Sequence, residues 1–221
     1  MPGAASALAT SVGDAAAPVL VFKAPLLNRI LANPDELEQR AVVLDLGGPC
    51  QVLLDRLSAT RPCRVEIADL VNNNGLGAIN ALESIEDEGP SLMRRLLPTG
   101  NDEPLDLILC WDLPNYLSLQ TLGLLIDVLA HRVAPGCQLH MLIAYSKREM
   151  ASIPGRYIPA PDGNLTQILP GDELTEAPRY SPENIGSALR NFVYQRGVLL
   201  ANGMQEFVYA WPDRQGVDKP Y

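Results

Sequence analysis

The chain has 221 residues, of which 47% are hydrophobic and 19% charged, a balance typical of a globular domain. Its formal net charge of −9 argues against nucleic acid or an anionic membrane surface as a partner, because both are negatively charged. No apolar run in the sequence is long enough to span a bilayer, and the four cysteines show no CxxC or CxxH spacing, so we predict no metal site.

The first half of the chain alternates between strand and helix patterns. Residues 1–18 lack a basic stretch before their alanines, so we interpret them as a flexible tail without an export signal and expect a cytoplasmic protein. Apolar residues at helical spacing predict a helix over 25–33. The apolar run at 41–46 predicts a strand covered on both faces. A helix over 51–59 and a second strand over 63–70 follow.

The middle of the chain contains the clearest elements. After a weaker helical pattern at 76–85, residues 91–98 are compatible with a short helix or a strand. A strong strand is predicted over 105–112. Residues 118–133 form the best helical pattern, with Ser118 as its N-cap, and 134–145 predict a turn followed by a strand.

The last third begins with a change of composition. Residues 150–182 contain six prolines and three glycines without periodicity, which is typical of a functional lid or a disordered insert. A helix is predicted from Ser181, with Pro182 at its first helical position. Two strands around Asn202 and Gly203 then predict an antiparallel hairpin.

Repeated strand–helix units require right-handed crossovers and therefore a parallel sheet with helices on both faces. The predicted fold class is α/β, a doubly wound and mostly parallel sheet that ends in an antiparallel hairpin. We expect one domain over 19–211, with 150–182 as its insert or lid and 212–221 as a C-terminal tail.

Three predicted strands end in an acid: Asp45, Asp69 and Asp112. Ligands of open parallel sheets bind beyond the carboxyl ends of the strands. The turn at Gly47 and Gly48 lets the main chain approach a ligand closely. Asp69 follows Asp45 by 24 residues, near the spacing at which an acid accepts the hydroxyl groups of a ribose.

This order resembles the class I S-adenosylmethionine-dependent methyltransferases, over roughly residues 25–211. The stretches that carry the resemblance are VLDLGG at 43–48, VEIADL at 65–70, LDLILCWDLPNYLS at 105–118, APGCQLHMLI at 134–143 and NGMQEFVYAW at 202–211. The closing hairpin favours this family over nicotinamide-dependent oxidoreductases, which normally end the same type of sheet with a further parallel strand.

The resemblance implies S-adenosylmethionine as the cofactor and methyl transfer, by in-line displacement, to a small-molecule or protein nucleophile. It implies cofactor-site roles for eight residues: Asp45, Gly47, Gly48, Asp69, Leu70, Cys110, Trp111 and Asp112. The first three belong to the methionine end and its turn, and the next two to the ribose and the adenine. The last three face the methyl group and the substrate. No residue is assigned as catalytic.

Two departures from the family pattern favour an alternative, a catalytically inactive relative that serves as a binding or scaffolding partner. Pro49 stands where the family carries a second glycine, and proline fixes φ and removes an amide donor. Between Asp69 and Leu105 the sequence shows no third strand, so the acid that usually touches the adenine has no counterpart.

Other polar residues have structural interpretations. We expect His140, inside an apolar strand, to be a hydrogen-bonded core residue, and Glu206 to face solvent in the hairpin. Trp111 either gates the substrate or packs in the core, and we favour packing. Residues 145–147 follow a strand and are interpreted as a loop.

Overall fold

The computed structural model describes residues 17–32, 40–71, 74–82, 84–98 and 102–212. The predicted tails at 1–18 and 212–221 lie almost entirely outside these residues.

A six-stranded sheet forms the centre of the molecule, in the order β10-β11-β5-β4-β2-β3. Its strands are β2 (Ala41–Asp45), β3 (Cys63–Ile67), β4 (Leu105–Trp111), β5 (Val133–Ala144), β10 (Val193–Leu199) and β11 (Met204–Ala210). Strands β3, β2, β4 and β5 are parallel, whereas β11 is antiparallel to both β5 and β10. The predicted fold class is therefore confirmed, including the reversed last strand.

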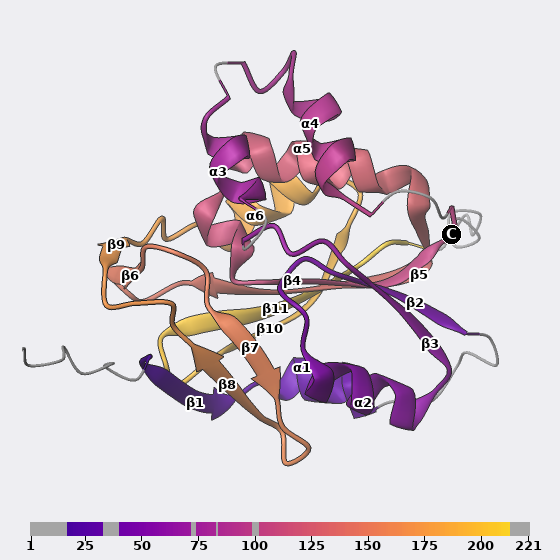
Figure 1. Cartoon of the computed structure of the whole chain (residues 1–221), viewed down its shortest axis with the longest axis vertical. Helices are drawn as coiled ribbons and strands as arrows, with labels where there is room; N and C mark the ends of the chain where they lie inside the picture. Colours follow the sequence, from indigo (N-terminus) through magenta and orange to yellow (C-terminus); the bar gives the residue numbers. More distant parts are fainter. Residues whose placement is uncertain (1–16, 33–39, 72–73, 83, 99–101, 213–221) are drawn as a thin grey trace, which may run out of the picture.

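Helices cover both faces of this sheet (Figure 1). One face carries α3 (Gly75–Asn80), α4 (Gly89–Leu96), α5 (Leu119–Leu129) and α6 (Pro182–Leu189), and the other carries α1 (Pro25–Ala32) and α2 (Gln51–Thr60). Short 3-10 turns, Leu113–Tyr116 and Ala130–Arg132, flank α5. Because helices lie on both sides, all five residues of β2 are buried.

Local signals locate most helix ends correctly. The hydroxyls of Ser118 and Ser181 accept hydrogen bonds from backbone amides of the first turns of α5 and α6, as N-caps do. The weak pattern at 76–85 gives a shorter helix, which ends at Asn80, and residues 91–98 belong largely to a helix rather than to a strand. Between Ile67 and Leu105, where the sequence analysis found no third strand, the described residues form none.

Two small sheets lie at one end of the molecule. Strand β1 (Val19–Lys23) pairs with β8 (Asn164–Ile168), which pairs with β7 (Arg156–Pro159); β6 (Glu149–Ala151) pairs with β9 (Leu174–Glu176). The sequence analysis found neither β1 nor any regular structure in 150–182. Both were missed because β1 and β8 are more than 140 residues apart and pair only in the folded chain.

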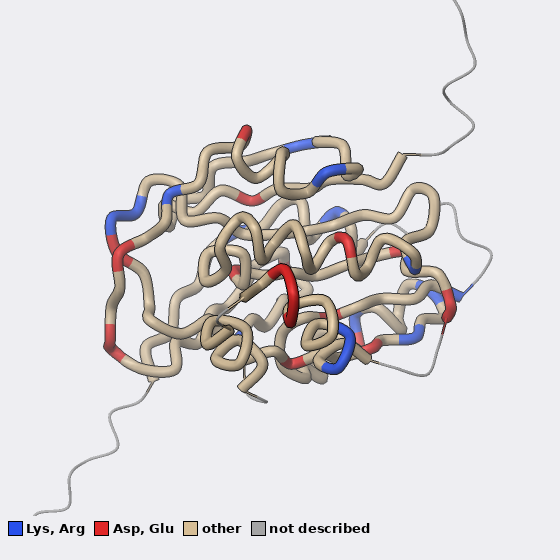
Figure 2. Tube along the Cα trace, turned by 90° about the horizontal axis from the view of Figure 1, so that it is seen from above, with Lys and Arg blue, Asp and Glu red and all other residues tan. Residues whose placement is uncertain are grey.

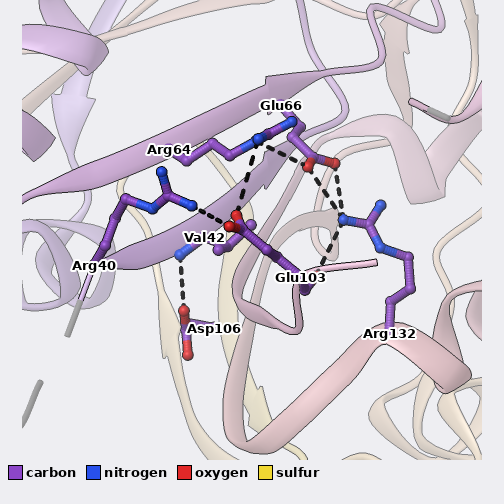
Figure 3. Close-up of polar contacts among 7 residues, drawn as sticks. All are labelled: Arg40, Val42, Arg64, Glu66, Glu103, Asp106 and Arg132. Carbon is purple, nitrogen blue, oxygen red and sulfur yellow. Dashed lines mark hydrogen bonds and ion pairs between the residues drawn. The ribbon is translucent and has the colours of Figure 1, made fainter. Parts of the chain in front are cut away.

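Acids and arginines form a connected network at the end of the sheet where β2, β4 and β5 begin, which we call the amino end (Figure 3). Glu66, the fourth of the five residues of β3, contributes its carboxylate to this network. One nitrogen of Arg132 contacts both carboxylate oxygens of Glu66, at 3.2 and 3.0 Å, and both side chains are buried. The exposed Arg64 contacts Glu66 at 3.4 Å, and Arg40 pairs with Glu103. Buried negative charge at this end is therefore matched by guanidinium groups.

Figure 2 shows lysine and arginine interspersed with aspartate and glutamate along the described trace. None of the helices in the described part of the chain is long and apolar enough to cross a membrane. Within the same residues, no three His, Cys, Asp or Glu side chains are grouped closely enough to hold a metal ion.

Candidate active site

The three acids of the sequence analysis lie at one edge of the sheet, because β3, β2 and β4 are parallel neighbours. Asp45 is the last residue of β2, Asp69 follows β3, and Asp112 follows β4. Asp45 and Asp112 are only 1% and 3% exposed, whereas Asp69 is half-buried. Their proximity confirms the expected meeting of strand ends, but two of the three acids are removed from solvent.

Trp111 lies directly on the glycine turn. Its indole nitrogen Nε1 donates a hydrogen bond of 2.6 Å to Asp45 Oδ1, and the backbone amide of Gly47 donates to the same oxygen at 2.9 Å. A Cβ atom on Gly47 would lie 2.8 Å from Trp111 Cδ1, so only glycine admits the indole here. The close approach that the sequence predicts at Gly47 is thus made by a side chain of the protein itself.

Aromatic neighbours fix the indole from two other sides. Tyr157 of β7 stacks on it, with ring centroids 5.3 Å apart and an angle of 3° between the planes. His140 of β5 meets it edge-on at 6.2 Å. These contacts favour the packing interpretation of Trp111, and they place the 150–182 segment over the carboxyl ends of the strands.

Backbone strain occurs at the same edge. Trp111 has φ of +51° and Asp69 has φ of +42°, in the left-handed region that residues other than glycine rarely adopt. Such conformations cost on the order of 1–3 kcal/mol each and cluster at ligand sites and switches. Strain at the carboxyl ends of β4 and β3, the two strands that flank β2, therefore marks this edge as a candidate functional site.

Burial also changes the acidity of two carboxyl groups. It raises the pKa of Asp45 to about 6, although hydrogen bonds from Trp111 and Gly47 act in the opposite direction. It likewise raises the pKa of Asp112 to about 6, against the backbone hydrogen bond from Gly155. Neither acid has a Lys, Arg or His nitrogen within 4.0 Å among the described residues. Neutral groups donate the hydrogen bonds to both carboxyl groups, and the more distant charge of Lys147 also acts to lower the pKa of Asp112.

Next to the turn lies a pocket of about 160 Å³, lined by Gly47, Gly48, Pro49, Trp111 and Tyr157, among others. Pockets that enclose a ligand usually measure roughly 300–1,000 Å³, so the space is small for an adenosyl cofactor. The Pro49 carbonyl oxygen accepts a hydrogen bond of 3.2 Å from Arg156, which joins this loop to β7.

Leu70 and Cys110 do not line this pocket, although the resemblance places them at the cofactor. Both side chains belong to the hydrophobic cluster under α3, α4, α5 and α6, and both are at most 1% exposed. Trp111 belongs to the cluster on the opposite face of the sheet. Successive residues of a strand point to opposite faces of the sheet, so the side chains of Cys110 and Trp111 cannot both face the same site.

S-adenosylmethionine fits these residues only in part. The turn, Asp45 and Asp69 lie at the carboxyl ends of the adjacent strands β2 and β3. The indole of Trp111, however, fills the space over Gly47, where the resemblance implies the methionine end of the cofactor.

Glu206 corrects an expectation of the sequence analysis, because its side chain is fully buried and does not face solvent. It accepts hydrogen bonds from the backbone amides of Leu26 (3.0 Å) and Leu27 (2.7 Å) in the first turn of α1. Its Oε1 also lies 2.9 Å from His140 Nε2. The expectation that His140 is a hydrogen-bonded core residue is confirmed. Pattern alone missed Glu206 because both faces of β11 are covered.

No protein-family model and no curated protein matches the sequence. Solved structures similar to the chain include an S-adenosylmethionine-dependent methyltransferase from Clostridium acetobutylicum ATCC 824, at 14% identity, over 78% of this chain and 85% of that one, with a TM-score of 0.47. The glycopeptide N-methyltransferase MtfA, solved with S-adenosyl-L-homocysteine, is 14% identical over 84% of this chain and 89% of its own, with a TM-score of 0.47. N-methyltransferase NodS from Bradyrhizobium japonicum WM9 is 15% identical over 78% and 86%, with a TM-score of 0.43. At these identities the likeness concerns the fold alone.

Proposed function

We propose that this chain is an S-adenosylmethionine-dependent methyltransferase that acts on a small-molecule or protein nucleophile and binds its cofactor when Trp111 leaves the glycine turn. The observation that carries the proposal is the placement of the Gly47–Gly48 turn and of Asp45 and Asp69 at the carboxyl ends of adjacent parallel strands. That edge is where open α/β sheets bind nucleotide-like ligands.

The opening movement is local in this proposal. Trp111 is fixed by one side-chain hydrogen bond to Asp45 and by its aromatic neighbours. Its left-handed backbone opposes these contacts, because relaxation of φ would release part of the strain. A ligand that contacts Asp45 and the Gly47 turn would compete with the indole for the same atoms.

A second candidate function, a binding or scaffolding protein without a cofactor, is favoured by a specific observation. The indole occupies the turn, bonds Asp45 and stacks on Tyr157, so the hollow is filled by side chains that complement one another. In this second candidate function, the carboxyl edge of the sheet belongs to the core, and the protein binds its partners through its outer surface.

Titration with S-adenosylhomocysteine separates the two functions. The chain has two tryptophans, so a Trp211→Phe background leaves Trp111 as the only indole emitter. A methyltransferase should bind the ligand with a change in Trp111 emission. Trp111→Gly, which vacates the turn and tolerates the positive φ, should bind it more tightly, and calorimetric titration compares the two affinities because this variant has no indole to follow. Failure of both proteins to bind at millimolar ligand, with native circular dichroism, would remove the methyltransferase proposal and favour the second candidate.

A second variant tests Asp69, the acid that follows β3. Asp69→Asn keeps the size of the side chain but removes the charge, so a ribose-binding role requires weaker binding of S-adenosylhomocysteine. An unchanged affinity would take Asp69 out of the site. Parallel titration with NAD tests the nicotinamide alternative, for which we expect no binding.

A further inference from the structure

A second cavity lies on the other side of Asp112, between the end of β4 and the small sheets. Its volume is about 110 Å³, and its polar lining includes Asp112, Asn115, Lys147 and Gln167. Trp111 and the glycine turn do not line it. The cavity is therefore distinct from the pocket beside Gly47.

Two acceptor atoms on the wall of this cavity have no partner. Asp112 Oδ2 accepts hydrogen bonds from the Gly155 amide at 3.2 Å and from Gln167 Nε2 at 3.4 Å, but Asp112 Oδ1 and Gln167 Oε1 accept none. Asp112 and Gln167 are 3% and 4% exposed, so both acceptors are shielded from bulk solvent. Buried polar atoms of native proteins are nearly always paired, and orphaned ones point to a bound group.

The polar side chains that line the cavity do not supply those donors. The Asn115 side chain donates to the carbonyl oxygens of Asp112 and Leu142 and accepts from the Ala144 amide, so its capacity is used. The Tyr116 hydroxyl lies 3.0 Å from the Ala151 carbonyl oxygen. The Tyr157 hydroxyl lies near the Asp112 carboxyl group from outside the lining and is itself buried without a hydrogen bond of standard geometry. Among the side chains that line the cavity, what is missing is therefore a hydrogen-bond donor and not an acceptor.

Charge narrows the choice of ligand. Lys147 lines the same cavity, yet its nitrogen forms no ion pair with Asp112 within 4.0 Å in the described part of the chain. Glu149 adds a second, exposed carboxylate to the lining. Bonds from a cationic donor to a buried carboxylate are about twice as strong as neutral ones, which favours an ammonium group over a neutral hydroxyl.

We propose that this cavity binds the primary ammonium group of a small aliphatic amine, with Asp112 Oδ1 and Gln167 Oε1 as its acceptors. The apolar lining side chains Leu20, Leu169 and Met204 would surround the short alkyl part. The site does not depend on the proposed methyltransferase function, because neither acceptor contacts the glycine turn and no cofactor takes part in binding.

The test follows backbone amide signals of the full chain in ¹H–¹⁵N spectra, without any cofactor, while ethylammonium chloride is added. The Gly155 amide, which donates to Asp112, is the reporter. So small a ligand is limited to a dissociation constant on the order of 1 mM. Tetramethylammonium chloride at equal concentration has the same charge but no N–H donor, and it should leave the Gly155 signal unchanged.

Variants assign the binding to the two acceptors. Asp112→Asn should weaken ethylammonium binding by about tenfold or more, because the buried charge is lost. Gln167→Met removes the other acceptor and should weaken it less; this variant decides the matter if Asp112→Asn does not fold. Asp127→Asn is the matched control. Asp127 is an exposed acid of α5 that pairs with Arg190, so this variant should bind ethylammonium normally.

Three outcomes would overturn the proposal. Equal responses to ethylammonium and tetramethylammonium would mean a general salt effect. No response at 100-fold the expected dissociation constant would mean that water and the Tyr157 hydroxyl satisfy the two oxygens without a ligand. If Asp112→Asn folds and binds ethylammonium with unchanged affinity, the amine binds elsewhere. If Asp112→Asn does not fold, an unchanged affinity in Gln167→Met leads to the same conclusion.

Discussion

The two ends of the central sheet treat buried acids in opposite ways. At the amino end, where β2, β4 and β5 begin, the carboxylate that the fourth residue of β3, Glu66, contributes is paired with Arg132 in the interior and with Arg64 at the surface (Figure 3). At the carboxyl end, Asp45 and Asp112 are buried with no cation of the described residues within 4.0 Å, and they accept hydrogen bonds from indole, amide and backbone donors.

The backbone follows the same division. Among the central strands, left-handed residues other than glycine occur at Trp111 and just after β3 at Asp69, both at the carboxyl end. The amino end is thus built for stability, whereas the carboxyl end carries strain and unmatched charge that a ligand could relieve. This contrast agrees with a binding site at the carboxyl end.

The largest effect is expected where the charge matching is broken. Arg132→Met leaves the Glu66 carboxylate buried with only the exposed Arg64 near it, which should lower the free energy of unfolding by about 3–5 kcal/mol. Urea unfolding at neutral pH measures the loss.

The double variant Arg132→Met with Glu66→Leu sharpens this test. It removes both charges and fills the space with apolar atoms, so most of the lost stability should return. A double variant as unstable as Arg132→Met alone would show that the packing of Arg132, and not its charge, supports the amino end.

The second effect is the pH dependence of stability that the buried acids at the carboxyl end should cause. The pKa of Asp45 is raised to about 6 in the folded protein against 3.8 for an ordinary aspartate, so the folded state binds this proton more tightly than the unfolded state. Stability should therefore fall as pH rises from about 4 to about 6, by on the order of 2–3 kcal/mol from this group, and then become constant. Asp112 should contribute a slope of the same sign.

Asp45→Asn isolates the part due to Asp45. The asparagine oxygen can still accept from Trp111 and Gly47, but nothing titrates at this position, so the loss of stability between pH 4.5 and pH 7 should shrink. Urea unfolding at the two pH values measures it, with Asp127→Asn as an exposed control. An unchanged slope would contradict the assignment of the buried charge to Asp45.

The third effect tests the link between the small sheets and the central sheet. A Cβ atom on Gly155 would lie 2.8 Å from both Cγ and Nε2 of Gln167, so Gly155→Ala should push Gln167 away from Asp112. We expect a loss of about 1–3 kcal/mol in the free energy of unfolding. Gly171→Ala, whose Cβ would meet nothing within 4 Å, is the control and should leave stability nearly unchanged.

The sequence predicts the central sheet well because its elements carry local signals. Three of these signals each lie within a short stretch of sequence: the apolar run of β2, the helical spacing of α5 with its Ser118 cap, and the turn between β10 and β11. Parallel neighbours then bring Asp45, Asp69 and Asp112 to one edge, which was also predictable.

What the sequence did not predict depends on contacts between distant segments. The pairing of β1 with β8 has no local period, so the small sheets were not found. Glu206 is buried because its carboxylate accepts hydrogen bonds from the amides of Leu26 and Leu27 in α1. The alternation of polar and apolar residues in β11 does not show that α1 packs there. Trp111 covers Gly47 through a left-handed φ and a stack on Tyr157, neither of which a motif encodes.

The smallest expected effect distinguishes buried pairing from mere charge balance at the amino end. Arg64 contacts the same Glu66 as Arg132 does, but its side chain is 43% exposed, and water and salt screen the contact. Arg64→Gln should therefore cost only about 0.2–1 kcal/mol, and the cost should diminish further in 1 M NaCl, whereas that of Arg132→Met should persist. Urea unfolding at low and high salt compares the two. If Arg64→Gln cost as much as Arg132→Met, the amino end would depend on the number of arginines near Glu66, and the contrast between the two ends would be one of charge count and not of desolvation.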